Sequence, residues 1–70
     1  MVNYEIDTER FEFGDNRFEN SLNKFGLKIK RIKTLGINSL TYEIEREKKL
    51  TDEEIDQIYC VDGVHEITNI

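Results

Sequence analysis

The sequence predicts an α+β fold in which one antiparallel sheet carries two helices on one face, with the element order β-α-β-β-α-β. Alternation of apolar and polar residues marks strands near the start, in the middle and at the end of the chain. Two stretches with helical spacing lie between these regions, and turn residues separate the two middle strands. With 70 residues, the chain has room for one small domain, which we place at 1–70.

The first predicted strand begins almost at the N-terminus. Val2, Tyr4 and Ile6 alternate with polar residues, which is the period of a strand with one buried face. Phe11 and Phe13 have the opposite parity, so the strand must be interrupted before them. A bulge could turn both rings inward, a turn could start an extra strand, or the rings could be exposed. We expect both in the core, since large exposed apolar patches are uncommon in monomers, whereas exposed rings would form an interaction anchor.

The first predicted helix begins at Asp15 or Asn16, either of which can act as its N-cap. Apolar residues then recur at intervals of four and three: Phe18, Leu22 and Phe25. Gly26 suits the position just after the helix, where many helices end in a left-handed conformation. The predicted helix is about three turns long.

The two middle strands are predicted to form a hairpin. Apolar residues alternate with charged ones in Leu27–Lys30, and with polar ones again in Leu40–Glu45, with Gly36 as a turn residue between them. The alternation slips at Lys30 and Arg31, which predicts a bulge in the first of these strands.

The second helix has the clearest local signal. Thr51 and Glu54 have the spacing of a capping box, and Leu50 and Ile55 hold the positions of a hydrophobic staple around it. The helix should therefore start within one residue of Thr51. Its predicted buried stripe comprises Ile55, Ile58 and Tyr59.

The last predicted strand, Val64–Ile70, follows a turn at Asp62 and Gly63, although its apolar residues Val64 and Ile67 are out of alternation. The complete order is the split βαβ arrangement of ferredoxin-like domains. Residues 55–67, where an amphipathic helix turns through glycine and valine into a strand, resemble the closing half of ACT-type and heavy-metal-associated ferredoxin-like modules. The heavy-metal family carries a two-cysteine loop after its first strand, whereas residues 8–14 contain no cysteine. The resemblance therefore implies the fold without the metal, and the ACT family implies a regulatory dimer that binds a small ligand.

Charge is segregated along the chain, whose formal net charge is −5. Residues 1–23 hold two cations and six acids, residues 24–49 hold eight cations and three acids, and residues 50–70 hold six acids with no Lys or Arg. Five cations follow one another without an intervening acid: Lys24, Lys28, Lys30, Arg31 and Lys33. This segregation predicts a dipolar surface rather than a catalytic centre.

The basic run has two interpretations. Its cations could follow a phosphate backbone, so RNA or DNA binding through Lys28 to Lys33 is an alternative function. In a hairpin, however, Lys28 and Lys30 would stand across from Glu45 and Glu43 as cross-strand ion pairs. This strand is also predicted to lie at an edge of the sheet, where lysines discourage unwanted pairing. We expect the structural role.

The acidic parts of the chain predict a protein-binding surface. Carboxylates near the N-terminus and in the second helix could bind the basic groove of another protein and compete there with nucleic acid. The predicted interaction residues are Phe11, Glu12, Phe13, Asp52, Glu53 and Asp56. The expected partner is another protein with a basic or nucleic-acid-binding surface, ahead of nucleic acid itself. A homodimer stays open, and no membrane contact is expected.

Catalysis and metal binding have little support in the sequence. Cys60, His65 and Glu66 form the only trio of nucleophile, base and orienting acid that is close in sequence, and their spacing matches no established metal site. Cys60 is expected to pack as a small buried residue. We predict no catalytic residue, cofactor or metal. The single cysteine and the absence of a long apolar run predict a cytoplasmic protein.

The predicted function is therefore that of a small non-enzymatic protein-protein interaction module. Its size, acidity and lack of catalytic motifs are typical of viral or accessory proteins that inhibit a host nucleic-acid-handling or defence complex. Nucleic-acid binding and an ACT-like regulatory dimer are the two alternatives.

Overall fold

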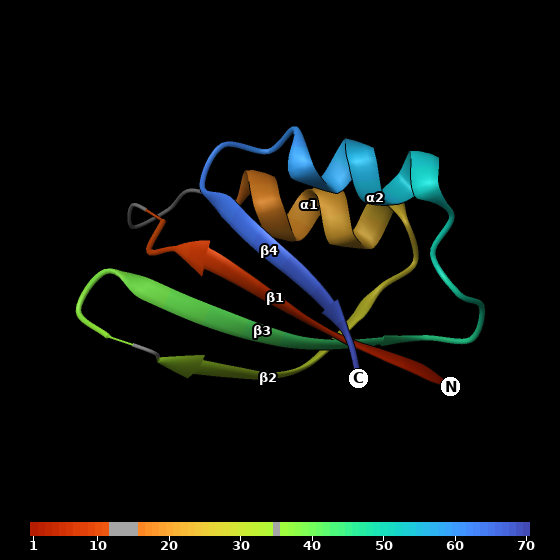
Figure 1. Cartoon of the computed structure of the whole chain (residues 1–70), viewed down its shortest axis with the longest axis horizontal. Helices are drawn as coiled ribbons and strands as arrows, with labels where there is room; N and C mark the ends of the chain where they lie inside the picture. Colours follow the sequence, from red (N-terminus) through yellow and green to blue (C-terminus); the bar gives the residue numbers. More distant parts are fainter. Residues whose placement is uncertain (12–15, 35) are drawn as a thin grey trace.

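A computed structural model of the chain describes residues 1–11, 16–34 and 36–70. The elements are β1 (Val2–Glu9), α1 (Arg17–Lys24), β2 (Lys28–Thr34), β3 (Ser39–Arg46), α2 (Asp52–Tyr59) and β4 (Val64–Asn69). The four strands form one antiparallel sheet in the order β2-β3-β1-β4, and the two helices lie side by side on one of its faces (Figure 1). The predicted ferredoxin-like α+β fold is confirmed.

The core lies between the sheet and the helices. Its buried apolar residues are Tyr4, Ile6, Phe18, Leu22, Leu27, Tyr42, Ile44, Leu50 and Ile58. In the two central strands, Tyr4 pairs with Ile44 and Ile6 with Tyr42, so one face of both strands is apolar. The Phe18 ring meets the Tyr42 ring edge-on, with 4.8 Å between centroids, and this contact fixes α1 on the sheet.

The slip of alternation in the last strand is caused by a bulge. In the pairing of β4 with β1, Val64 stands opposite Thr8 and Glu66 stands opposite Asp7. His65 is therefore an extra residue in β4. The bulge restores the phase, and Val64 and Ile67 both pack against the core.

Helix α1 is eight residues long, about two turns instead of the predicted three. Its apolar stripe lies as predicted, with Phe18 and Leu22 buried. The helix ends where the sequence predicted, because Gly26, at φ 71°, turns the chain back on itself. The N–H of Gly26 donates to the Asn23 carbonyl (3.1 Å), and the N–H of Leu27 donates to the Leu22 carbonyl (2.9 Å). Asn16 is the N-cap, without a capping side-chain bond, and Asp15 lies outside the described residues.

Helix α2 begins at Asp52, and its predicted capping box is confirmed. The N–H of Glu54 donates to the Thr51 hydroxyl (3.2 Å), and the N–H of Thr51 donates to the Glu54 carboxylate (3.0 Å). The predicted burial of Tyr59 and Cys60 is wrong, since both are exposed. Helix α2 packs on the edge strand β4, so its C-terminal end lies at the margin of the core.

Phe11 lies against the core, in agreement with the sequence prediction. Its ring is half-buried and stacks on Phe18, with 5.4 Å between the centroids. Gly63 packs directly against this ring at φ 96°. Phe13 and Glu12 lie outside the described residues, so the predictions for them stay untested. Neither described helix is long and apolar enough to cross a membrane.

Candidate interaction surface

The sheet face that points away from the helices carries most of the charge of the strands. In β1 the residues between the buried positions point to this open face, and they pair with the polar residues of β3 and β4. Five carboxylates from these three adjacent strands share the open face: Glu5, Asp7, Glu43, Glu45 and Glu66. We call this set the acidic face.

The bulge in β2 gathers the basic residues of that strand on the same face. The register with β3 shifts between Ile29 and Arg31, where the sequence predicted a bulge, so Lys30 is the extra residue. After the shift, Arg31 stands opposite Glu43, and Lys30 also lies close enough to Glu45 to form an ion pair. A regular strand would alternate its side chains and divide these cations between two faces. The open face is therefore dipolar, with a basic edge beside the acidic face.

Ion pairs join the basic edge to its neighbouring strands. The closest joins Lys33 to Glu43 (2.7 Å), and two longer contacts join Arg31 to Glu43 (3.7 Å) and Lys30 to Glu45 (3.9 Å). The sequence expectation of cross-strand pairing is thus confirmed in kind. Lys28 stands opposite Glu45 as predicted, but the bulge then shifts the register by one residue, so that Arg31, in place of Lys30, stands opposite Glu43.

Lys33 also relieves a repulsion inside the sheet. Glu5 and Glu43 stand directly opposite each other on β1 and β3, an arrangement that destabilises a sheet when both are charged. The ammonium group of Lys33 lies 2.7 Å from one carboxylate and 4.0 Å from the other. Its hydrogen bond to Glu43 raises the pKa of Lys33 and lowers the pKa of Glu43, so both stay charged at neutral pH.

The acids nearer β4 have fewer cationic neighbours. Asp7 accepts a hydrogen bond from the Thr41 hydroxyl (2.7 Å) and stands opposite Glu66 of β4. Among the described residues, no Lys or Arg forms an ion pair with either of these carboxylates. The negative charge of the acidic face is therefore best exposed over β1 and β4.

The residues predicted for nucleic-acid binding do not all lie on one surface. Lys28, Lys30, Arg31 and Lys33 follow β2, but Lys24 ends α1 and lies over the Phe25 ring, 5.8 Å from its centroid. The aromatic residues that the structure describes lie on the helical side of the sheet or in the helices, so the open face presents no described ring for base stacking. This arrangement favours a structural role for the basic strand.

The residues predicted for protein contact are also divided. Asp52, Glu53 and Asp56 are exposed on α2, in the helical layer on the other side of the sheet from the acidic face. Phe11 packs against the core and is only partly buried, so its role in protein contact stays a prediction. Glu5 and Asp7 belong to the N-terminal carboxylates that the sequence indicated as part of an acidic surface. Glu43 and Glu45 were not predicted to lie on that surface, although their alternation with the apolar residues of the same strand was a usable signal.

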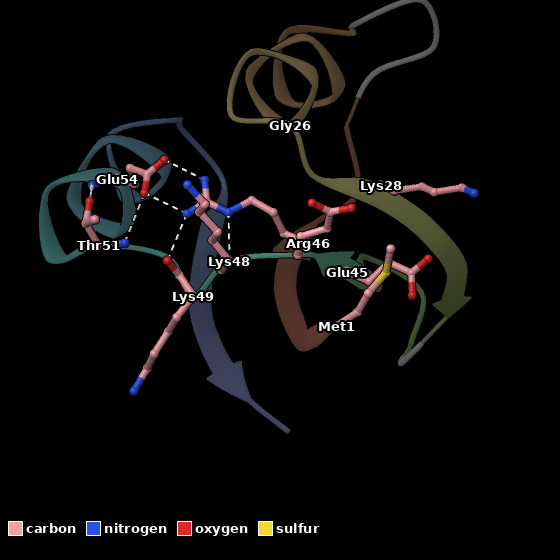
Figure 2. A pocket seen from close by; sticks show the side chains of 10 residues that line it. Met1, Gly26, Lys28, Glu45, Arg46, Lys48, Lys49, Thr51 and Glu54 are labelled. Atoms are coloured by element: carbon pink, nitrogen blue, oxygen red, sulfur yellow. Dashed lines mark hydrogen bonds and ion pairs between the residues drawn. The ribbon is translucent and has the colours of Figure 1, made fainter.

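An open groove of about 660 Å³ lies between the end of β3 and the start of α2 (Figure 2). Arg46 is one of the residues that line it, and its side chain points toward Glu54 of α2. Its guanidinium makes two hydrogen bonds to the Glu54 carboxylate (2.6 and 2.8 Å) and donates to the carbonyls of Phe25 (3.0 Å), Lys48 (2.9 Å) and Lys49 (2.9 Å).

These contacts occupy all five N–H donors of Arg46. The hydrogen bonds from Arg46 and from the Thr51 backbone hold the pKa of Glu54 at about 2. Because Arg46 has no donor left for a ligand, we interpret its role as structural: its hydrogen bonds hold β3, the end of α1 and the start of α2 together.

The residues considered for catalysis lie at the surface. His65 sits in the β4 bulge with its Nε2 atom 3.6 Å from a carboxylate oxygen of Glu9, and Cys60 is exposed at the end of α2. The described part of the chain contains no group of three or more His, Cys, Asp or Glu side chains arranged to hold a metal ion. Comparisons of the chain with protein-family models, curated proteins and solved structures give no significant match.

Proposed function

We propose that this protein is a small cytoplasmic, non-enzymatic interaction module that binds another protein through its acidic face. The expected partner surface is basic and normally binds nucleic acid, so that binding inhibits a nucleic-acid-handling or defence complex, as viral or accessory inhibitors do. One observation carries the proposal: five carboxylates from three adjacent strands gather on a single face of the sheet.

The geometry of the sheet supports recognition of a basic surface. Residues two apart on a strand are separated by about 6.8 Å along the backbone, and neighbouring strands lie about 4.8 Å apart, so the backbone positions of these acids form a regular array. Four of these acids lie on the central strands β1 and β3, whose fixed backbone reduces the conformational entropy lost on binding. A negative array also accelerates encounter with a positive partner, and this effect decreases as salt rises.

The proposal is tested by removing charge from the acidic face without changing its shape. The variant combines Glu5→Gln, Asp7→Asn and Glu66→Gln, because these three acids are the least engaged by cations. The control combines Asp52→Asn, Glu53→Gln and Asp56→Asn, which removes the same number of charges from α2. Each tagged protein is incubated with nuclease-treated lysate of its native host, and the retained proteins are identified and quantified at low and high salt.

We expect the wild type and the α2 variant to retain one stoichiometric protein that the acidic-face variant loses. The purified partner should then bind nucleic acid less tightly when the wild type is added. Loss only in the α2 variant would place the contact on the helix and refute the role of the acidic face. Retention of the same protein by both variants would refute electrostatic recognition altogether.

Nucleic-acid binding through β2 is the second candidate, because the bulge places four cations on one face. Glu43 and Glu45 on the adjoining strand β3 would repel a phosphate backbone, and for this reason we rank nucleic-acid binding lower. Replacing Lys28, Lys30 and Arg31 by Gln should abolish binding of a labelled oligonucleotide if this candidate is right. The ACT-like ligand-binding dimer stays a prediction of the sequence, and a gain in Tm in a screen of amino acids would support it.

A further inference from the structure

Strand β2 forms an edge of the described sheet. Its inner side pairs with β3, and Figure 1 shows it at the margin of the sheet, away from both helices. The backbone N–H and C=O groups on its outer side therefore have no strand partner among the described residues. Such an edge can accept a further strand from another chain, because the added strand supplies the missing hydrogen bonds.

The helical side of β2 is apolar and only partly covered, because Ile29 packs against the core whereas Ile32 is exposed. Ile29 and Ile32 stand opposite Ile44 and Tyr42 of β3, so they belong to the side of the sheet that carries the helices. Helix α2 packs on β4 at the other edge of the sheet, and Ile32 is 48% exposed. A strand added beside β2 would cover Ile32 if it carried apolar residues on the same side.

The open-face side of β2 is basic, and the acids that form ion pairs with it in the described part of the chain lie on its inner side. Arg31 is 69% exposed, and among the described residues it reaches Glu43 only through a long contact of its Nε atom (3.7 Å). Lys28 stands opposite Glu45, whose carboxylate lies nearer to Lys30. Acidic residues on an added strand would contact these cations from the outer side, as Glu43 and Glu45 do from the inner side.

The geometry points to strand addition: β2 accepts an extended segment of a partner protein in which acidic residues alternate with β-branched apolar residues. The acids of the segment pair with Lys28, Arg31 and Lys33, and its apolar residues cover Ile32. A second copy of β2 is a poor occupant because its cations would stand opposite those of the first. The cations of β2 thus disfavour pairing with most strands at this edge and favour pairing with an acidic one.

Synthetic peptides test this inference directly. The probe is a short, end-blocked, fluorescein-labelled peptide in which Glu alternates with Val. One comparison peptide has Lys in place of each Glu, and a second keeps the Glu-Val sequence but carries N-methyl groups on the backbone nitrogens of one edge. Binding is measured by fluorescence anisotropy, and amide hydrogen exchange of the protein is followed by NMR with and without the probe.

We expect the Glu-Val peptide to bind and to slow hydrogen exchange in β2. The Lys peptide should bind at least about tenfold more weakly, because like charges would stand opposite each other. The N-methylated peptide should also lose about tenfold in affinity, because it cannot donate to the outer edge of β2. Equal binding of the N-methylated peptide, or unchanged exchange in β2, would overturn the inference.

Matched variants separate this site from general electrostatic attraction. Combining Lys28→Gln with Arg31→Gln should lower the affinity for the Glu-Val peptide about tenfold. The control combines Lys48→Gln with Lys49→Gln, which removes the same charge while leaving intact the carbonyls that Arg46 contacts. Equal weakening in both variants would overturn strand addition at β2. The acidic-face variant should bind the peptide like the wild type, so failure here is distinguishable from failure of the proposed function.

Discussion

Removing the Tyr4 hydroxyl tests how the segment before α2 is held. Tyr4 is 2% exposed, and its hydroxyl accepts a hydrogen bond from the N–H of Leu50 (2.8 Å), a residue that is 4% exposed. In Tyr4→Phe this N–H loses its partner and stays away from water. An unsatisfied buried donor costs about 1–3 kcal/mol, so we expect the free energy of unfolding to fall by about 2 kcal/mol. At about 4–8 °C per kcal/mol for a domain of this size, the Tm should fall by roughly 8–16 °C.

Tyr59 provides a matched control for this substitution. Its hydroxyl also accepts a hydrogen bond from a backbone N–H, that of Ile67 (2.9 Å), but Tyr59 is 42% exposed. Water can replace the hydroxyl there, so Tyr59→Phe should change the free energy of unfolding by at most about 0.5 kcal/mol. The two tyrosines therefore lose the same group from hydrogen bonds of similar length and differ mainly in burial.

Urea unfolding followed by far-UV circular dichroism gives both free energies, provided that the two variants and the wild type share the same m-value. Differential scanning calorimetry gives the Tm values independently. Equal losses in the two variants would refute the reasoning, because burial would then not determine the cost. A loss below about 0.5 kcal/mol in Tyr4→Phe would show that the Leu50 N–H finds another partner.

Three further predictions concern charge and backbone conformation. Because the folded pKa of Glu54 is about 2 and its ordinary value is 4.5, its stabilising effect is complete above about pH 4.5 and is lost as the pH falls toward 2. The drop in Tm over this range should be smaller in Glu54→Gln; an unchanged drop would assign it to other groups. Gly63→Ala should lower the free energy of unfolding in urea more than Gly26→Ala does. Both glycines have a positive φ, but only at Gly63 would the new Cβ meet another atom, at 2.9 Å. Similar losses would mean that this contact relaxes freely. Lys33→Gln should lower the Tm more at low salt than at high salt, because it exposes the repulsion between the opposed carboxylates of β1 and β3. A salt-independent loss would contradict that role.

The elements were predictable where their signals lie within a few residues. The capping box of Thr51 and Glu54 fixed the start of α2, because both hydrogen bonds join residues of the same turn. Gly26 marked the end of α1 because only glycine adopts its φ of 71° without strain. The slip at Lys30 marked the β2 bulge, because a bulge is one extra residue in an alternating pattern. The burial predicted for Tyr59 was wrong because it depends on how far α2 extends over β4.

The candidate site was only partly predictable. The parity of Glu5 and Asp7 put them on the polar face of one strand, which is local information. Their position beside Glu43 and Glu66 depends on β1 lying between β3 and β4, and those strands are far away in the chain. Phe11 could not be assigned from its parity, since its burial depends on contacts with Phe18 and Gly63.

By itself, the sequence determined the order of the elements, their caps and turns, and which residues of each strand are apolar, because hydrogen bonding and hydrophobic periodicity act over a few residues. The tertiary structure alone decided which charges are neighbours. Strand order placed β1 in the centre and β2 at the edge, and the bulge in β2 turned four cations toward one face. Electrostatic interactions depend on distance in space rather than on separation along the chain, so the acidic face and its basic edge exist only in the folded protein.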